Sequence, residues 1–454
     1  MELGAMSALA LADRIHRRAL SSEEVVRYFL ERAQRLNPEV HAFVDLFERR
    51  ALMSARRKDR TRSDAAFHGV PIAVKDLNFV RGTFSRMGSR AFQYLFAPFD
   101  DDNVASLRRG GVVIIGKATT SEIGALPVTE PDTHPPTRNP WNRAHSAGGS
   151  SGGSGAAVSA NLVPFAQGSD GGGSVRIPAA LCGLFGFKPS RGRLPYPNAF
   201  VRAIGLSTSG ALAHTVDDGA ALYDVMRGVT TRDAVLATRA ERRQRLGKKR
   251  LRIRLITQSP IAKTAPVLEE AARKTACVLE ALGHTIEECA VPPATLDEFL
   301  PLWGSMMARV PFSSTRLMEP TTRWLAELGK GLRLEDLIVH RDRLAARILG
   351  MMDGADFLVS PTVAMESPLV GEFAALPAEE KFRALAPLGI FTAPFNISGQ
   401  PAASIPAGLS PRGLPMGVQL VGHLGADDDV LALASQLEEA MPWALRASPL
   451  ASGV

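Results

Sequence analysis

A chain of 454 residues with 45% hydrophobic and 22% charged residues has the composition of a globular protein that can bury an extensive core. It contains no uninterrupted apolar run of about 18 residues, which argues against a membrane-spanning helix. The net charge of +7 would suit an anionic partner, but the basic residues are scattered and densest only at 239–254. We therefore expect no nucleic-acid partner.

The cysteines and the first residues bear on the cellular compartment. Cys182, Cys277 and Cys289 cannot all pair and lie in apolar or helical contexts, which favours a reducing compartment. The N-terminal apolar run lacks a preceding basic region and is interrupted by Asp13, so it does not resemble a signal peptide. We expect a cytoplasmic protein, either a monomer or a homodimer, with no membrane partner.

The first elements along the chain are a helix and two short strands. Ser21 and Glu24 are typical of a helix N-terminus and precede apolar residues at helical spacing. Apolar runs at 70–74 and 112–116 indicate buried strands, and the first run ends directly at Lys75. A lysine that ends a strand is usually a solvated cap. A buried lysine, in contrast, has a pKa below about 10.4, and its neutral amine can serve as a base.

The most informative stretch spans residues 146–178 and holds two clusters of glycine and serine, at 148–155 and 169–174. The apolar segment between them, 156–167, predicts a helix that runs into a short strand, which a flexible linker would not contain. Glycine at this density exposes backbone N–H groups. Such groups suit a cradle for an anion or an oxyanion.

Three chemistries could use this stretch. A phosphate-binding loop needs a lysine directly after its glycines, and neither cluster has one. The nucleophile elbow of an α/β-hydrolase needs G-x-S-x-G, which residues 148–152 match with Ser150 at the centre. The residues before this motif, 139–145, are polar and do not predict the buried strand that an elbow requires. A serine–lysine hydrolase would use both clusters together with Lys75.

The third chemistry agrees with a resemblance. Residues 148–192 and the lysine segment 69–76 closely resemble the signature segments of the amidase signature family. Carried over position by position, the resemblance implies that Ser174 is the nucleophile, Ser150 the bridging serine and Lys75 the base. It also implies a cis peptide bond before Ser150.

The resemblance extends to the surroundings of the nucleophile. It implies that the oxyanion is held by the backbone N–H groups of Gly171, Gly172 and Gly173, with that of the nucleophile itself. Asp170 and Arg176 flank this loop, and we expect them to support it by pairing. Gly171 stands where threonine, isoleucine or alanine is commoner in the family, so we expect a more mobile oxyanion loop. Segments 137–142 (TRNPWN) and 395–402 (FNISGQPA) are similar to those of the family's nylon-oligomer (aminohexanoate cyclic-dimer) hydrolases.

Strand and helix patterns alternate along the rest of the chain. Strands are predicted at 251–256 and 357–360, and helices at 266–282, 334–352 and 428–441. This alternation predicts an α/β fold in one domain over residues 1–454, with a large central mixed β-sheet covered by helices on both faces. The resemblance implies the same fold. It covers a core at 65–225 and 386–445, and residues 225–385 are expected to be a variable layer that shapes the substrate pocket.

Two stretches rich in Trp, Met, Phe and Leu, 300–312 and 386–395, are expected to line that pocket, with Arg309 as their only charged residue. The pocket residues proposed from them are Trp303, Met306, Met307, Phe391 and Phe395. An unpaired charge buried there would cost several kcal/mol. The predicted substrate is therefore an uncharged, largely apolar aryl or alkyl amide or oligoamide. A serine acyl-enzyme would also accept carbamates, urethanes and esters.

The sequence has no metal-ligand spacing among its histidines and cysteines, and we expect neither a metal nor a cofactor. The expected partner is a small-molecule amide. Two alternatives stay open. Some family members are glutamine amidase subunits of tRNA-dependent amidotransferases, which pass ammonia to a partner protein. An esterase built on an elbow at Ser150 is the other.

Overall fold

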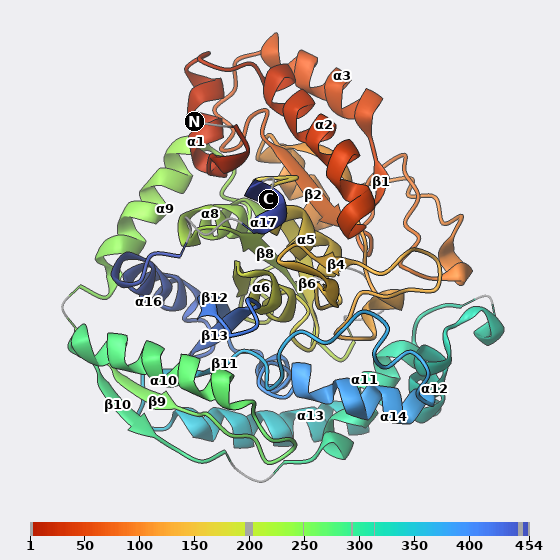
Figure 1. Cartoon of the computed structure of the whole chain (residues 1–454), viewed down its shortest axis with the longest axis vertical. Helices are drawn as coiled ribbons and strands as arrows, with labels where there is room; N and C mark the ends of the chain where they lie inside the picture. The colour runs from red at the N-terminus through yellow and green to blue at the C-terminus, as the bar shows by residue number, and fades with distance from the viewer. Residues whose placement is uncertain are drawn as a thin grey trace.

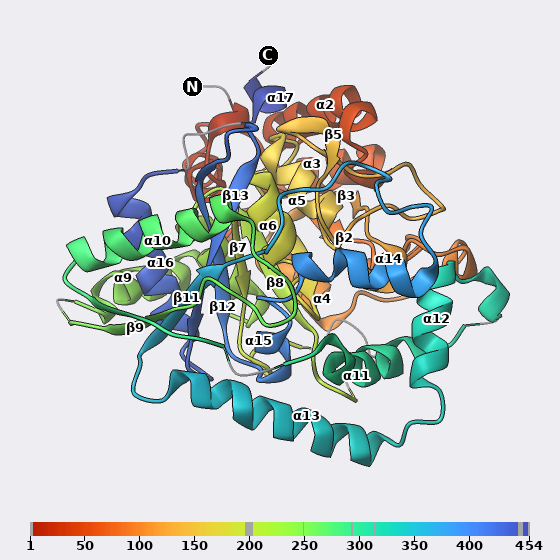
Figure 2. The same cartoon turned by 60° about the horizontal axis from the view of Figure 1, so that its bottom comes forward.

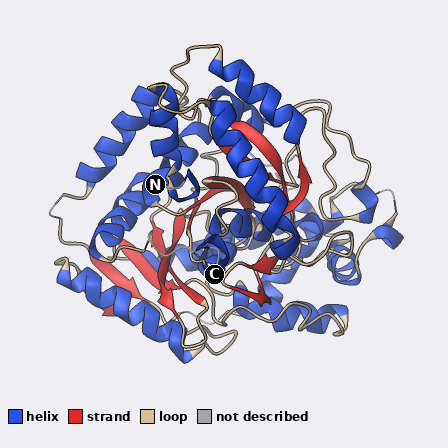
Figure 3. Cartoon of the chain, turned by 45° about the horizontal axis from the view of Figure 1, so that its top comes forward, coloured by secondary structure: helices blue, strands red, loops and turns tan. Residues whose placement is uncertain are grey.

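One mixed β-sheet runs through the protein, with helices on both faces (Figures 1 and 3). The structure is a computed structural model that describes residues 3–195, 203–247, 249–291, 294–312, 314–443 and 448–452. Within these residues the sheet has 11 strands in the order β1-β3-β2-β6-β8-β7-β12-β13-β11-β9-β10. The predicted α/β fold with a large mixed sheet is confirmed.

The strands of the sheet are β1 (Phe43–Leu46), β2 (Pro71–Lys75), β3 (Val113–Ala118), β6 (Phe165–Asp170), β7 (Phe185–Lys188), β8 (Thr208–Ala213), β9 (Arg252–Leu255), β10 (Thr285–Glu288), β11 (Phe357–Pro361), β12 (Ala402–Leu409) and β13 (Pro415–Gly422). A separate two-stranded sheet consists of β4 (Arg138–Asn139) and β5 (Asn142–Ser146). Strands β3, β2 and β6 are parallel to one another, and so are β11, β9 and β10. The strands that link the two groups, β8, β7, β12 and β13, pair antiparallel with their neighbours from β6 to β11.

The helices of the first half are α1 (Ala8–His16), α2 (Ser22–Val40), α3 (Glu48–Asp59), α4 (Asp102–Arg109), α5 (Gly152–Ser159), α6 (Arg176–Cys182), α8 (Val216–Met226) and α9 (Arg232–Arg245). Those of the second half are α10 (Pro266–Ala281), α11 (Leu296–Ala308), α12 (Pro320–Gly329), α13 (Leu334–Leu349), α14 (Ala378–Leu385), α15 (Pro394–Ile397), α16 (Asp427–Ala440) and α17 (Pro449–Ser452). None of the helices in the described residues is both long and apolar enough to cross a membrane.

Adjacent residues of β7 show how the helices are divided between the two faces. A Cβ on Gly186 would lie 2.4 Å from Ala179 of α6, so this residue faces α6. Its neighbour Phe185 packs against Gly219 of α8, where an added Cβ would lie 2.5 Å from the ring. Successive residues of a strand point to opposite faces, so α6 and α8 lie on opposite sides of the sheet.

Local sequence signals agree with the observed boundaries. Ser21 is the N-cap of α2, and its side chain accepts a hydrogen bond from Glu24 N–H at 3.0 Å. Every residue of β2 is buried, as expected for a strand covered on both faces, and Lys75 is its last residue. The predicted strand at 112–116 corresponds to β3, and the predicted helix at 266–282 corresponds to α10.

Residues 225–385 contribute to the molecule in two ways. Strands β9, β10 and β11 extend the central sheet at one edge, next to β13. Helices α11 to α14 instead form a layer beside the sheet, with α13 along the rim of the molecule (Figure 2). The helices of this layer pack around a second hydrophobic core. Segment 385–397 and residues of β11 to β13 also contribute side chains to it. One wall of the site described next comes from this layer.

Candidate active site

Lys75 ends β2, and its side chain is completely buried. Its Nζ donates hydrogen bonds to Ser150 Oγ at 2.7 Å and to Ser169 Oγ at 3.1 Å. Burial lowers the pKa of Lys75 to about 7, although the negative charge of Asp170 acts in the opposite direction. Near neutral pH a large share of this amine is therefore uncharged, as a proton acceptor must be.

Ser150 lies directly ahead of α5, in the first glycine- and serine-rich segment, and follows a cis peptide bond from Gly149. This is the cis bond that the family resemblance implies. A side chain at 149 has no room, because a Cβ there would lie 2.6 Å from the backbone of Val128. Ser150 is 1% exposed. Its hydroxyl therefore meets Lys75 inside the protein.

Ser174 lies between the end of β6 and the start of α6. Its carbonyl oxygen accepts a hydrogen bond from Ser151 N–H at 3.2 Å, which joins it to the segment that carries Ser150. Ser151 Oγ also donates to the carbonyl of Ser169 in β6 at 3.2 Å. Ser174 is 7% exposed and lines a cavity. The structure thus brings the three predicted residues to one place, with only Ser174 reaching the cavity.

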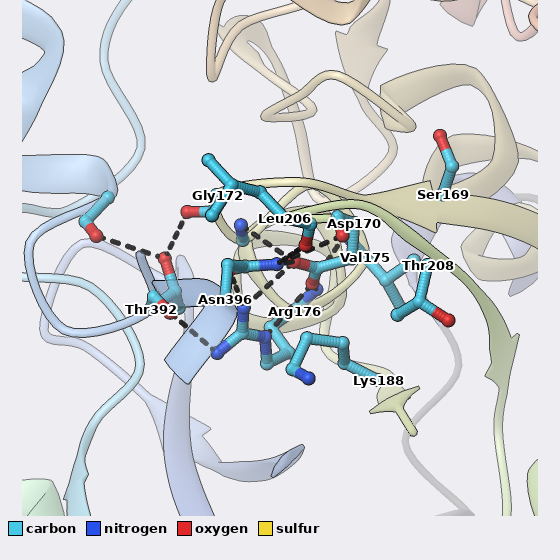
Figure 4. Close-up of polar contacts among 12 residues, drawn as sticks. Ser169, Asp170, Gly172, Val175, Arg176, Lys188, Leu206, Thr208, Thr392 and Asn396 are labelled. Carbon is cyan, nitrogen blue, oxygen red and sulfur yellow. Dashed lines mark hydrogen bonds and ion pairs between the residues drawn. The ribbon is translucent and has the colours of Figure 1, made fainter. Parts of the chain in front are cut away.

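The loop that carries Ser174 is anchored by a fully buried ion pair between Asp170 and Arg176, with a nitrogen–oxygen distance of 2.8 Å (Figure 4). Arg176 uses its other donors on Asn396 Oδ1 at 2.6 Å, Gln419 Oε1 at 2.6 Å and Thr392 O at 3.0 Å. Burial by itself raises the pKa of Asp170, but the charge and hydrogen bonds of Arg176 outweigh it and hold the pKa well below its usual range. An ionised carboxylate engaged in this way supports the loop and carries no proton to exchange.

The three glycines ahead of Ser174 are not equivalent. Gly172 lines the cavity beside Ser174. The N–H of Gly173 donates to Asp170 Oδ1 at 2.8 Å and is therefore already engaged inside the protein. Of the three predicted oxyanion donors, Gly171 and Gly172 are the better candidates.

Gly171 is a tightly packed position. A Cβ there would lie 2.6 Å from Ser207 Oγ and 3.2 Å from the ring of Trp303. The Trp303 indole is held in turn, because its Nε1–H donates to Ala125 O at 3.1 Å and its ring stacks on Phe299 with centroids 5.4 Å apart. The space that a larger family residue would fill at 171 is thus taken by Trp303. Close packing against Ser207 and Trp303 therefore accounts for this glycine, and the greater loop mobility stays a prediction.

The cavity beside Ser174 is lined mainly by apolar side chains. They come from the segment after Ser121, from α11 and α13, and from residues 382–397. The lining includes Ala125, Leu126, Leu296, Phe299, Trp303, Leu344, Ile348, Leu385, Ile390, Phe391 and Phe395. Such a lining suits an apolar ligand with few polar groups.

Three of the five predicted pocket residues line this cavity, namely Trp303, Phe391 and Phe395. Met306 and Met307 do not line it, and the prediction is corrected for them. They are 2% and 1% exposed and belong to the core of the helical layer. The reason is the helix direction: α11 meets the cavity with its first turns, and the two methionines lie one turn beyond Trp303, where α11 packs against α12.

Two charged residues of the lining were not connected with the pocket from the sequence. Glu298 of α11 and Arg347 of α13 form a bidentate ion pair, with distances of 3.0 and 2.7 Å. Glu298 also accepts a hydrogen bond from Thr295 N–H at 3.1 Å. Because the two charges are paired with each other, neither is an unpaired charge for a substrate to neutralise. Arg309, the charge noted in the sequence, is not among the lining residues.

Sequence reasoning missed several residues that hold the site. Ser169 lies in the second glycine- and serine-rich cluster, and the sequence alone indicates no role for it, although its hydroxyl accepts a hydrogen bond from Lys75. Asn396 falls in the segment that resembled the family, so the resemblance was its only signal. Gln419 lies in residues 413–421, which likewise resemble the family. Thr392 carried no such signal, because its contacts join parts of the chain more than 200 residues apart.

Two further possibilities can be compared with the geometry. Strand β5, which precedes Ser150, belongs to the small sheet with β4, and its His145 also forms an isolated bridge with Leu369. Ser150 therefore does not follow a strand of the central sheet as an elbow nucleophile would. Among the described residues, no three His, Cys, Asp or Glu side chains are grouped so that they could hold a metal ion.

A sequence model of the amidase family, described as "Amidase", matches residues 24–431. The chain therefore belongs to the amidase family, and it is an amide hydrolase of the amidase signature type.

Individual relatives are similar over nearly their whole length. The 6-aminohexanoate-cyclic-dimer hydrolase of Pseudomonas sp. (strain NK87) is 36% identical over 97% of this chain and 95% of its own. The solved structure of a 6-aminohexanoate cyclic dimer hydrolase complexed with substrate has a TM-score of 0.89 and 30% identity, covering 99% of this chain and 100% of that chain. A bacterial aryl acylamidase of the amidase signature family has a TM-score of 0.86 and 25% identity, covering 99% of both chains.

Proposed function

We propose that the protein cleaves uncharged, largely apolar amides with Ser174 as nucleophile, Ser150 as bridging serine and Lys75 as base. The observation that carries this proposal is the 2.7 Å hydrogen bond between Lys75 Nζ and Ser150 Oγ, formed by a completely buried lysine. Ser174 lies on the neighbouring segment and faces the apolar cavity, where an amide would bind.

The first half of the reaction forms an acyl-enzyme. Neutral Lys75 accepts the proton of Ser150, and Ser150 accepts the proton of Ser174 as Ser174 Oγ attacks the amide carbonyl carbon. The carbonyl oxygen becomes an oxyanion, which receives hydrogen bonds from the backbone N–H groups of Gly171 and Gly172 and from that of Ser174 itself. Ser150 then gives a proton to the amide nitrogen and regains one from the Lys75 ammonium. The C–N bond breaks, and the amine leaves.

The second half consumes water. Lys75 is neutral again after the amine has left, so the same relay can deprotonate a water molecule. The resulting hydroxide attacks the ester of Ser174, the C–O bond to the serine breaks, and Ser150 returns a proton to Ser174 Oγ. The acid is released and the triad regains its starting protonation. An ester or a carbamate would follow the same steps, because Ser150 can protonate an alkoxide as well as an amine.

The lining of the cavity is suited to apolar groups of a substrate. It is dominated by Leu, Ile, Phe and Trp side chains, and its two charged residues pair with each other. Two similar structures are those of a 6-aminohexanoate cyclic dimer hydrolase and of a bacterial aryl acylamidase. Glutamine carries two charged groups, and each would lose water in this lining without a free partner. The geometry therefore favours apolar amides over the glutamine amidase alternative.

A labelling experiment and a substrate panel test this proposal. We expect a fluorophosphonate probe to modify Ser174 alone, and Ser174→Ala to lose both the label and about 10⁶-fold of the activity. Relative kcat/KM for an anilide, an aryl carbamate and glutamine then tests the substrate class. Labelling that survives in Ser174→Ala would overturn the nucleophile, and glutamine as the best of the three substrates would overturn the apolar class.

A further inference from the structure

Thr392 contacts the loop of the nucleophile from a distant part of the chain. It lies just ahead of α15 and is completely buried. Its Oγ1 is 2.7 Å from Gly172 O and 3.1 Å from Gly389 O (Figure 4). A threonine hydroxyl has one proton to donate, and the shorter distance identifies the Gly172 carbonyl as its acceptor.

This contact fixes one end of the peptide unit between Gly172 and Gly173. The other end is the N–H of Gly173, which donates to Asp170 Oδ1 at 2.8 Å. In a planar trans peptide the C=O and the N–H point in opposite directions. Thr392 and Asp170 therefore hold the same peptide plane from opposite sides, at a Gly–Gly step whose backbone would otherwise be unusually free.

The surroundings are fitted to this arrangement. A Cβ on Gly173 would lie 2.1 Å from Thr392 Oγ1, and the φ angle of Gly173 is +126°, so a side chain is excluded both by space and by backbone conformation. The backbone of Thr392 is also anchored, because its carbonyl accepts a hydrogen bond from Arg176 at 3.0 Å. Arg176 is paired with Asp170. The two holders of the peptide plane thus share one fully buried anchor.

We propose that Thr392 is a positioning residue for the oxyanion hole. It keeps the Gly172 carbonyl turned away from the reacting oxygen. The N–H groups of Gly172 and Ser174, which belong to the peptides before and after this one, can then point toward that oxygen. Without the hydroxyl, the Gly172–Gly173 peptide can rotate and bring a carbonyl oxygen, a dipole of the wrong sign, toward the oxyanion. The inference rests on the proposed function, since it assumes that Ser174 is the nucleophile.

The test compares Thr392→Val, which keeps the side-chain shape without the hydroxyl, with Thr392→Ser, which keeps the hydroxyl. Thr264→Val is the matched control, because Thr264 is also completely buried and its hydroxyl has no partner in the described structure. Removal of an oxyanion donor costs about 10²–10³ in kcat, so we expect its misalignment in Thr392→Val to lower kcat about 10- to 100-fold. KM should stay within about threefold of the wild type, because the contact acts in the transition state. Thr392→Ser and Thr264→Val should retain most of the activity.

Two further readouts separate a positioning role from a structural one. The rate of fluorophosphonate labelling at Ser174, which places a phosphoryl oxygen in the oxyanion position, should fall in Thr392→Val in parallel with kcat. The thermal unfolding midpoint of Thr392→Val, and the pH dependence that Lys75 sets, should stay close to those of the wild type. Equal losses in Thr392→Val and Thr392→Ser, wild-type rates in Thr392→Val, or a loss confined to KM would overturn the inference. A wild-type protein that is neither labelled at Ser174 nor able to cleave the anilide would instead overturn the proposed function, and the inference with it.

Discussion

Two neighbouring strands each bury a lysine completely, and the two lysines have different surroundings. Lys75 ends β2, whereas Lys117 lies on the adjacent parallel strand β3. The Nζ of Lys117 is 2.9 Å from a carboxylate oxygen of Asp76, which is itself buried. The Nζ of Lys75 instead donates to the hydroxyls of Ser150 and Ser169.

The difference teaches what makes a buried lysine available as a base. Removal from water penalises any ammonium ion, and a carboxylate at ion-pair distance can offset that penalty. Neutral hydroxyls offset it much less, and burial accordingly lowers the pKa of Lys75 to about 7. Burial at a strand end is common to both lysines. The chemistry of the partner, therefore, separates the proposed base from the structural ion pair.

The largest expected effect is on activity. Lys75→Met should lower kcat/KM at least about 10⁴-fold, because the proton of Ser174 then has no acceptor in the relay. Methionine has a similar length and no charge, so the fold should be retained, which circular dichroism can check. Lys117→Met is the matched substitution on the neighbouring strand, and we expect its folded fraction to keep activity within about tenfold of the wild type. Similar losses of specific activity in both variants would contradict the comparison.

The ion pair of Lys117 should matter for stability instead. Burial raises the pKa of Asp76, and the charge of Lys117 opposes this rise, so Lys117→Met leaves a buried carboxyl group without its cation. We expect the free energy of unfolding to fall by about 3–5 kcal/mol. Addition of Asp76→Asn should recover part of that loss. Chemical denaturation at constant pH measures both steps, and no recovery in the double variant would show that the pair is not the cause.

Local sequence patterns predicted the parts of the site that depend on nearby residues. The apolar run at 70–74 identified β2 and placed Lys75 at its end, since a continuous apolar run with a glycine boundary needs no distant partner to be recognised. The apolar segment between the two glycine- and serine-rich clusters likewise predicted the helix and strand seen as α5 and β6. The roles of the three proposed catalytic residues came from resemblance, because their spacing alone left an elbow at Ser150 open.

Contacts between distant segments could not be predicted in this way. Thr392 and Gly172 are 220 positions apart, and their hydrogen bond depends on how the last part of the chain packs against β6 and α6. Trp303 and Met306 lie on the same helix and are equally apolar in the sequence. Only the placement of α11 against α12 and the cavity decides that Trp303 lines the cavity, whereas Met306 does not.

The pKa of Lys75 sets the expected pH dependence. Its pKa is lowered from the ordinary value to about 7, so the amine is protonated and inactive as a base below pH 7 and neutral above it. The value of kcat/KM should therefore rise about tenfold per pH unit up to about pH 7 and then level off. A pH–rate profile at constant ionic strength measures this limb. A flat profile through this range, or the same limb in the residual activity of Lys75→Met, would show that another group titrates.

The smallest expected effect concerns Ser169, a hydrogen-bond partner of Lys75. It is also the sharpest test of how such a partner sets the pKa of a buried lysine. The Oγ of Ser169 accepts a hydrogen bond from Lys75 Nζ at 3.1 Å, and such a bond favours the charged amine. Ser169→Ala should therefore lower the pKa of Lys75 further and move the acid limb to lower pH by less than about one unit. The plateau rate should fall only about two- to fivefold, because the base is weaker but the relay is intact. Ser154→Ala is the control, since Ser154 Oγ is buried and donates to Gln167 O without contacting the lysine. An equal shift in Ser154→Ala, or a limb that moves to higher pH in Ser169→Ala, would mean that the hydroxyl next to Lys75 does not tune its charge.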